Sequence, residues 1–78
     1  MLKLASILSS DDQDTIIECE IINRRHDGTA VCVVGVEAKH VWLPLSVCEI
    51  IDEYRGENFG MWAEISVPNW LVAKKPLV

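Results

Sequence analysis

Two runs of alternating, β-branched sequence dominate the first half of the chain. They cover residues 15–25 and 29–36, and the dipeptide Asp27-Gly28 lies between them. β-branched residues favour strands, and Asp-Gly between two such runs favours a tight hairpin turn. The pattern therefore predicts an antiparallel hairpin.

A turn centred on Asp27-Gly28 pairs residues whose numbers sum to about 55. The predicted partners are Asn23 and Cys32, Ile21 and Val34, and Cys19 and Val36. Alternation then predicts one nearly apolar face, made of Ile17, Cys19, Ile21, Ala30, Cys32, Val34 and Val36. It predicts a mixed second face, made of Ile16, Glu18, Glu20, Ile22, Arg24, Val31 and Val33. Because a solvated face rarely keeps Ile22 beside Val33, we expect the N-terminal strand, a closing barrel or a partner to cover part of it.

The second half predicts two further strands and a terminal helix. Residues 38–43 read as a strand that stops at Pro44, since proline has no amide hydrogen for a central ladder. Residues 61–67 alternate apolar and polar positions, as a half-buried strand does. Pro68 suits the first turn of a helix that Pro76 ends, and Trp70 is expected to pack this helix onto the sheet.

Residues 46–54 fit either a helix or a strand, and the helical spacing of Val47, Ile50 and Tyr54 makes helix the preferred interpretation. The polar cluster at residues 9–14 separates an N-terminal strand and linker segment, residues 1–14, from one small β-rich domain, residues 15–78. The predicted fold is mainly β with a minor α component. We expect a small curled antiparallel sheet or partly open barrel with a short C-terminal helix.

Composition narrows the class of protein. A chain of 78 residues with a net charge of −5 forms one small domain, and it lacks the basic excess that favours direct nucleic-acid binding. The three cysteines are an odd number with wide spacing, which fits a reducing cytoplasm better than a secreted disulfide framework. No signal peptide and no apolar run long enough for a bilayer is recognised, so no membrane association is expected.

The sequence shows no catalytic or metal-binding pattern. Phosphate-binding glycine loops, His-Glu-x-x-His and Gly-x-Ser-x-Gly are absent, so neither an enzyme nor a cofactor is predicted. Cys19, Cys32 and Cys48, together with His26 and His40, match no zinc spacing. Each cysteine sits among apolar residues, which favours a small core side chain over a reactive thiolate.

The candidate sites are therefore surfaces. Trp42 and Trp62 fall out of phase with their apolar neighbours, so at least one is expected on the second face or at a rim. The predicted protein-binding residues are Trp62, Glu64, Glu49, Asp52, Glu53 and Glu57, an acidic set around one tryptophan that suits a basic partner. The predicted residues of a nucleic-acid site, the alternative, are Arg24, Arg25 and Lys39, with Trp62 as a stacking platform.

Two segments carry a resemblance. Val-Trp-Leu-Pro-Leu-Ser-Val at residues 41–47 and Ile-Ser-Val-Pro-Asn-Trp-Leu-Val-Ala-Lys-Lys-Pro-Leu-Val at residues 65–78 resemble small uncharacterised bacteriophage and prophage proteins. In that family a strand ends in Trp-Leu/Ile-Pro-x-Ser, and the chain finishes in Pro-Glu-Trp-Leu-Ala and a short basic tail. The similarity covers about residues 16–78, with Asn69 in place of the usual Glu and Pro76 in place of the usual Gly. The resemblance implies a phage or prophage origin and no particular chemistry.

Together these observations favour a non-catalytic phage or mobile-element module that binds a host or phage protein in the bacterial cytoplasm. An inhibitor of a host defence complex, such as a CRISPR effector, is one form of it. The alternatives are a single-strand nucleic-acid accessory module of phage replication or recombination, and a homo-oligomeric structural protein. The sequence leaves open whether the chain is a monomer or a homodimer.

Overall fold

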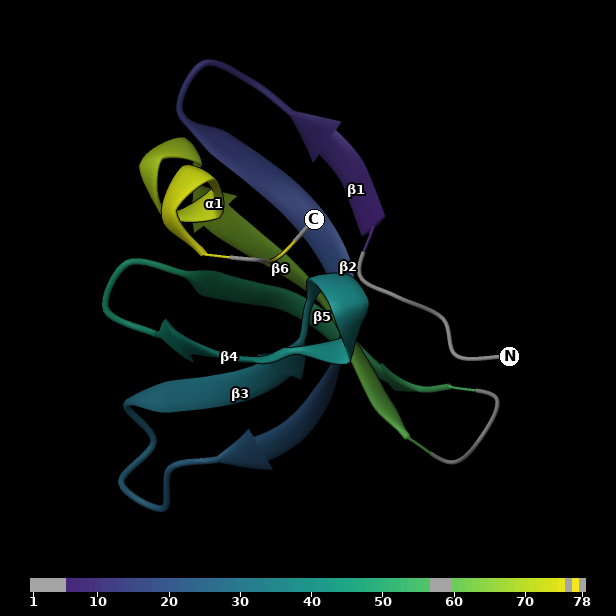
Figure 1. Ribbon diagram of the computed structural model, residues 1–78. Helices are drawn as coiled ribbons and strands as arrows, with labels where there is room; N and C mark the ends of the chain where they lie inside the picture. Colours follow the sequence, from purple (N-terminus) through teal and green to yellow (C-terminus); the bar gives the residue numbers. More distant parts are fainter. Residues whose placement is uncertain (1–5, 57–59, 76, 78) are drawn as a thin grey trace.

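The protein folds into one antiparallel sheet with a short helix at its C-terminal end (Figure 1). The computed structural model describes the chain apart from residues 1–5, 57–59, 76 and 78. The elements are β1 (Ser6–Ser10), β2 (Asp14–Arg24), β3 (Ala30–Val34), the 3-10 turn η1 (Val36–Ala38), β4 (His40–Pro44), β5 (Glu49–Arg55), β6 (Met61–Pro68) and α1 (Asn69–Lys74). The strand order is β4-β3-β2-β6-β5, with β1 paired to β2, and the sheet is not closed into a barrel. The predicted fold class, a mainly β protein built on a curled antiparallel sheet, is confirmed.

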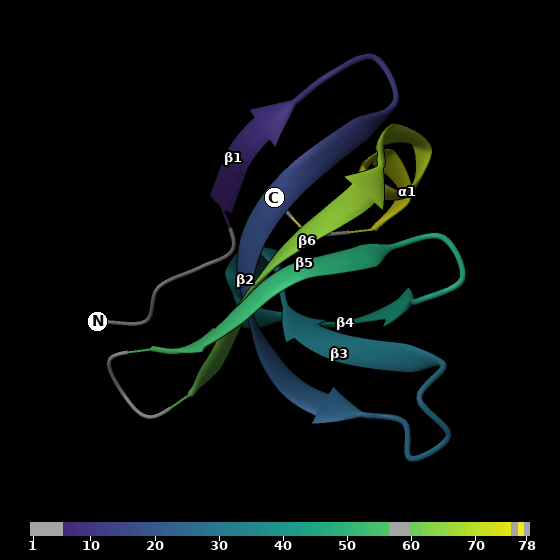
Figure 2. The same cartoon turned by 180° about the vertical axis from the view of Figure 1, so that it is seen from behind.

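The longest strand, β2, organises the sheet. β6 runs along one of its edges from Asp14 to Ile21. The other edge is shared, because β1 pairs with the first half of β2 and β3 with the second half. The sheet bends where β2 changes neighbours, as Figures 1 and 2 show.

A bulge in β2 corrects the predicted hairpin register. Asn23 lies opposite Cys32, as predicted, but Ile21 lies opposite Val33 and not Val34, because the register shifts between Ile21 and Asn23. Cys19 lies opposite Ala63 of β6 and not Val36, since β3 ends at Val34. The extra residue, Ile22, remains exposed.

The bulge also exchanges the two faces of β3. Val31 and Val33, which the sequence places on the mixed face, belong to the hydrophobic core. Cys32 lies on the opposite side, paired with Trp42 of β4, and is still buried. The core side chains are Ile17, Cys19, Ile21, Val31, Val33, Val41, Leu43, Cys48, Ala63, Ile65, Val67, Leu71 and Leu77.

The preferred helix at residues 46–54 is wrong. Pro44 ends β4, and its carbonyl accepts hydrogen bonds from the amides of Val47 and Cys48 in the turn that follows. β5 then pairs with β6, with a bulge between Ile50 and Asp52. The residue inserted at the bulge shifts the period-2 pattern by one, which imitates helical spacing. β4 itself begins at His40 and not Ala38, because Glu37 and Ala38 have φ of 57° and 59°.

The terminal helix forms where predicted, with Pro68 just before its first residue. Leu71, and not Trp70, is the buried residue of α1, whereas Trp70 is 55% exposed beneath the ammonium group of Lys74. The helix ends at Lys74, and Pro76, the predicted terminator, lies outside the described residues.

Candidate protein-binding face

The side of β2, β6 and β5 that faces away from the core carries a concentration of carboxylates. Strand alternation turns Glu18 and Glu20 outward between the buried residues of β2. Pairing with β6 and β5 adds Glu49, Asp52 and Glu64 on the same side, together with the aromatic residues Tyr54 and Trp62. We call these seven residues, Glu18, Glu20, Glu49, Asp52, Tyr54, Trp62 and Glu64, the acidic face.

Three carboxylates of the acidic face form a row across neighbouring strands. Glu18 lies directly opposite Glu64, and Glu64 lies directly opposite Asp52. Like charges at directly opposed positions of a sheet repel one another and lower its stability. The row therefore concentrates negative charge at one place on the acidic face.

Tyr54 lies beside this row and is hydrogen-bonded to one of its members. Its hydroxyl donates a hydrogen bond to a carboxylate oxygen of Glu18. The pKa of Tyr54 is raised above its ordinary value by burial, then by the hydrogen bond to Glu18 and by the neighbouring carboxylates of Glu18, Glu64 and Asp52. The phenol therefore remains a protonated donor throughout the physiological range.

Trp62 and Glu20 lie close to the two glycines that flank the β5–β6 connection. A Cβ atom at Gly56 would overlap the Trp62 indole, and one at Gly60 would overlap the Glu20 carboxylate. The Gly56 amide donates to the Gly60 carbonyl at 2.8 Å. Because both glycines allow close approach, the tryptophan is fixed against the backbone and half-buried at the edge of the acidic face.

The structure brings together four of the six predicted protein-binding residues. Trp62, Glu64, Glu49 and Asp52 lie on the acidic face. Glu53 turns to the core side of β5, opposite Ala63, and Glu57 lies outside the described residues.

The predicted set omitted Glu18, Glu20 and Tyr54. Both glutamates were placed on the mixed face by their alternation with Ile17, Cys19 and Ile21. The sequence did not predict which strand pairs with β2, since nothing within residues 14–24 indicates that β6 lies beside them. Tyr54 was missed because its segment was interpreted as helical.

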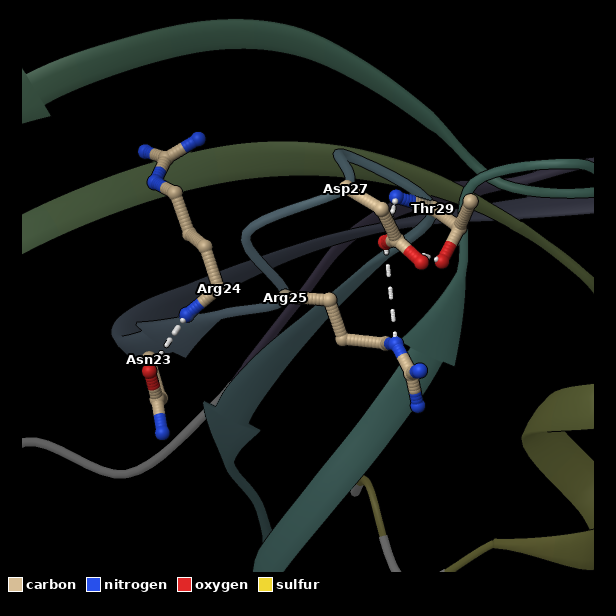
Figure 3. A network of polar contacts seen from close by, with 5 residues as sticks. All are labelled: Asn23, Arg24, Arg25, Asp27 and Thr29. Carbon is tan, nitrogen blue, oxygen red and sulfur yellow. Dashed lines mark hydrogen bonds and ion pairs between the residues drawn. The ribbon is translucent and has the colours of Figure 1, made fainter.

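The predicted basic residues do not form one patch. Arg24 makes an ion pair with Glu53 across the curl of the sheet. The Nε atom of Arg25 lies 3.6 Å from a carboxylate oxygen of Asp27, whose carboxylate also accepts hydrogen bonds from Thr29. Figure 3 shows the side chains of Arg24 and Arg25 pointing away from each other. Lys39 lies 4.0 Å from Glu37, so each of the three cations has a carboxylate partner.

The three cysteines are buried and free of disulfides. Burial raises the pKa of the Cys19 thiol to about 12, that of Cys48 to about 11, and that of Cys32 above its ordinary value. These groups are therefore thiols at neutral pH, not thiolates. Within the described residues, no three His, Cys, Asp or Glu side chains are grouped as metal ligands would be.

Comparison with known proteins identifies no relative: no family model, no curated protein and no solved structure matches the chain. Among the described residues, no helix has the length and hydrophobicity needed to cross a bilayer.

Proposed function

We propose that the protein is a non-catalytic binding module whose acidic face docks onto a basic surface of a protein partner. The observation that carries this proposal is the row of directly opposed carboxylates, Glu18, Glu64 and Asp52, beside the half-buried Tyr54 and Trp62. The charges supply attraction to a cationic surface, and the fixed aromatic rings supply contact area at little cost in conformational entropy.

The basic residues support a protein partner over a nucleic acid. Arg24, Arg25 and Lys39 each lie beside a carboxylate, so a phosphate has to compete with an existing ion pair at every one of them. The net charge of −5 adds a general repulsion between the domain and a polyanion.

The acidic face is complementary in charge to the surface of a nucleic-acid-binding complex. Such surfaces are basic, and a carboxylate row can occupy the place of phosphates on them. Together with the resemblance to small phage proteins, this favours a phage or prophage module that acts on a host complex, for example as an inhibitor of a CRISPR-type defence effector, inside the bacterial cytoplasm.

Cross-linking in host lysate, followed by affinity capture, tests the proposal. We expect the wild-type domain to retain a basic protein, and the Asp52→Asn, Glu64→Gln double variant to lose it. Glu37→Gln is the matched control, because it removes an exposed carboxylate away from the acidic face. Retention that survives both face substitutions, or that the control abolishes equally, contradicts the assignment of this face.

A further inference from the structure

Three of the described strands, β1, β4 and β5, have one neighbour each, and the two at the ends of the β4-β3-β2-β6-β5 path differ in whether their edges are closed to further pairing. An open edge presents unpaired amide and carbonyl groups, so natural sheets cover it, shorten it, or place proline, bulges and charged side chains on it.

The edge at β4 is occupied at two positions, Trp42 and Pro44. The Gly35 amide donates to the Lys39 carbonyl, and the Leu45 amide donates to the Thr29 carbonyl, so the backbone groups of Lys39 and Leu45 point toward β3. Strand alternation then points those of Trp42 and Pro44 away from β3. The Trp42 carbonyl accepts a hydrogen bond of 2.8 Å from Lys75 Nζ. Pro44 has no amide hydrogen, and its carbonyl is already occupied by the turn that follows.

The edge at β5 carries a bulge and charged side chains, but within the described residues no proline lies in it and no side chain is shown bonding its backbone groups. The Gly56 amide points toward β6, where it bonds Gly60, so alternation directs the amides and carbonyls of Glu53 and Arg55 to the free edge. The bulge at Ile51 lies before this segment and leaves Asp52 to Arg55 in regular register with β6. Figures 1 and 2 show this end of β5 running away from β4 toward the β5–β6 turn.

We infer that the free edge of β5 binds an extended basic peptide segment, which adds to the sheet as an antiparallel strand beside the acidic face. This inference rests on the proposed function and specifies how the partner is held. Residues of the added strand opposite Asp52 and Tyr54 lie on the acidic face, so complementarity of charge requires Lys or Arg there. Residues opposite Glu53 and Arg55 exchange backbone hydrogen bonds with them. The recognised pattern is therefore Lys/Arg-x-Lys/Arg in extended conformation.

Fluorescence anisotropy with a labelled (Lys-Thr)4 peptide tests the mode of binding, with two N-methylated versions as probes of the backbone. With lysines over the acidic face, the threonine amides point at β5 and the lysine amides point at solvent. We expect N-methylation of the threonine nitrogens to weaken binding by about tenfold or more, and N-methylation of the lysine nitrogens to change it by less than about twofold. A neutral (Gln-Thr)4 peptide is the control for charge.

The outcomes separate the inference from the proposed function. If both N-methylated peptides bind as well as the parent while (Gln-Thr)4 does not, the acidic face binds and the edge does not, which overturns the inference alone. If (Lys-Thr)4 binds no better than (Gln-Thr)4, both fail.

Two measurements on the protein itself complete the test. Hydrogen exchange at the Glu53 and Arg55 amides should slow at least about tenfold when (Lys-Thr)4 binds. Arg55→Pro, which removes one edge amide, should weaken binding relative to Arg55→Ala, which keeps it. A dimeric mass by light scattering, with these amides already protected in the peptide-free protein, means that a second copy occupies the edge, and it overturns the inference.

Discussion

At the scale of single residues, the acidic face shows a conflict between stability and charge. Glu64 stands between Glu18 and Asp52, so its carboxylate faces a like charge on both neighbouring strands. Tyr54 donates a hydrogen bond to Glu18, at one end of this row. Repulsion within the row predicts that replacing its central carboxylate raises stability.

Glu64→Gln should therefore stabilise the free protein. Removing the central charge relieves two repulsive pairs, for a gain of about 0.5 kcal/mol in the free energy of unfolding at low salt. Urea denaturation at two ionic strengths measures it, and the gain should shrink at high salt because the charges are screened. The control is Glu37→Gln, which should change stability little. Destabilisation by Glu64→Gln at low salt would show that the row is favourable in the free protein.

At the scale of elements, the helix is tied to the first turn of the sheet through Asn69. The amide of Asn69 donates to the Gln13 carbonyl, and its side-chain Nδ2 donates to the Asp11 carbonyl. Its Oδ1 accepts a hydrogen bond of 2.7 Å from the hydroxyl of Thr15. Thr15 is the one buried polar residue among those that the structure describes. Asn69 therefore connects α1 to β2 and to the β1–β2 turn.

A double-mutant cycle on Thr15 and Asn69 should show this connection. Asn69→Ala leaves a buried hydroxyl without its acceptor and should cost about 1–3 kcal/mol of stability. In a Thr15→Val background the same change should cost about 1 kcal/mol less, since the hydroxyl is already gone. Equal costs in both backgrounds, measured by urea denaturation, would mean that the hydrogen bond contributes nothing to stability.

The positions of most strands could be predicted from the sequence, but the two bulges could not. Alternation located the hairpin strands and the strand at β6, and proline located the end of β4 and the start of α1. The bulges at Ile22 and Ile51 were missed, because an inserted residue has no distinctive side chain and is specified by pairing with a distant strand. Each bulge changed the predicted faces: Val31 and Val33 entered the core, and β5 was mistaken for a helix. The acidic face was half recognised for the same reason, since it depends on β2 pairing with β6.

At the scale of the whole molecule, the buried thiols make stability depend on pH. The pKa of Cys19 is raised by burial from its ordinary value of 9.0 to about 12, and that of Cys48 to about 11. Because the folded state raises these pKa values, their contribution to stability is complete below pH 9 and is lost as pH rises through the folded values. We expect the free energy of unfolding to fall from pH 9 upward, and to fall less steeply in Cys19→Ala. Urea denaturation between pH 7 and 11 measures both, and a flat profile contradicts the burial of the thiols.

β4 and β5 do not pair with each other, and two residues that follow α1 contact the sheet. Leu77 is 0% exposed and belongs to the core, while Lys75 holds the β4 edge through the Trp42 carbonyl. Leu77 therefore adds to the core a side chain that comes from outside the strands.

Leu77→Ala should destabilise the protein by about 2–5 kcal/mol, the usual cost of the cavity left by a buried leucine. Since a domain of this size has only a few kcal/mol of net stability, the variant should be largely unfolded at moderate urea concentrations. Leu8→Ala is the matched control, because it deletes the same atoms from a side chain that is 47% exposed in β1 and should cost less than about 1 kcal/mol. Far-UV circular dichroism during urea denaturation follows both variants. Equal stability of the two variants would mean that the burial of Leu77 contributes little to the stability of the fold.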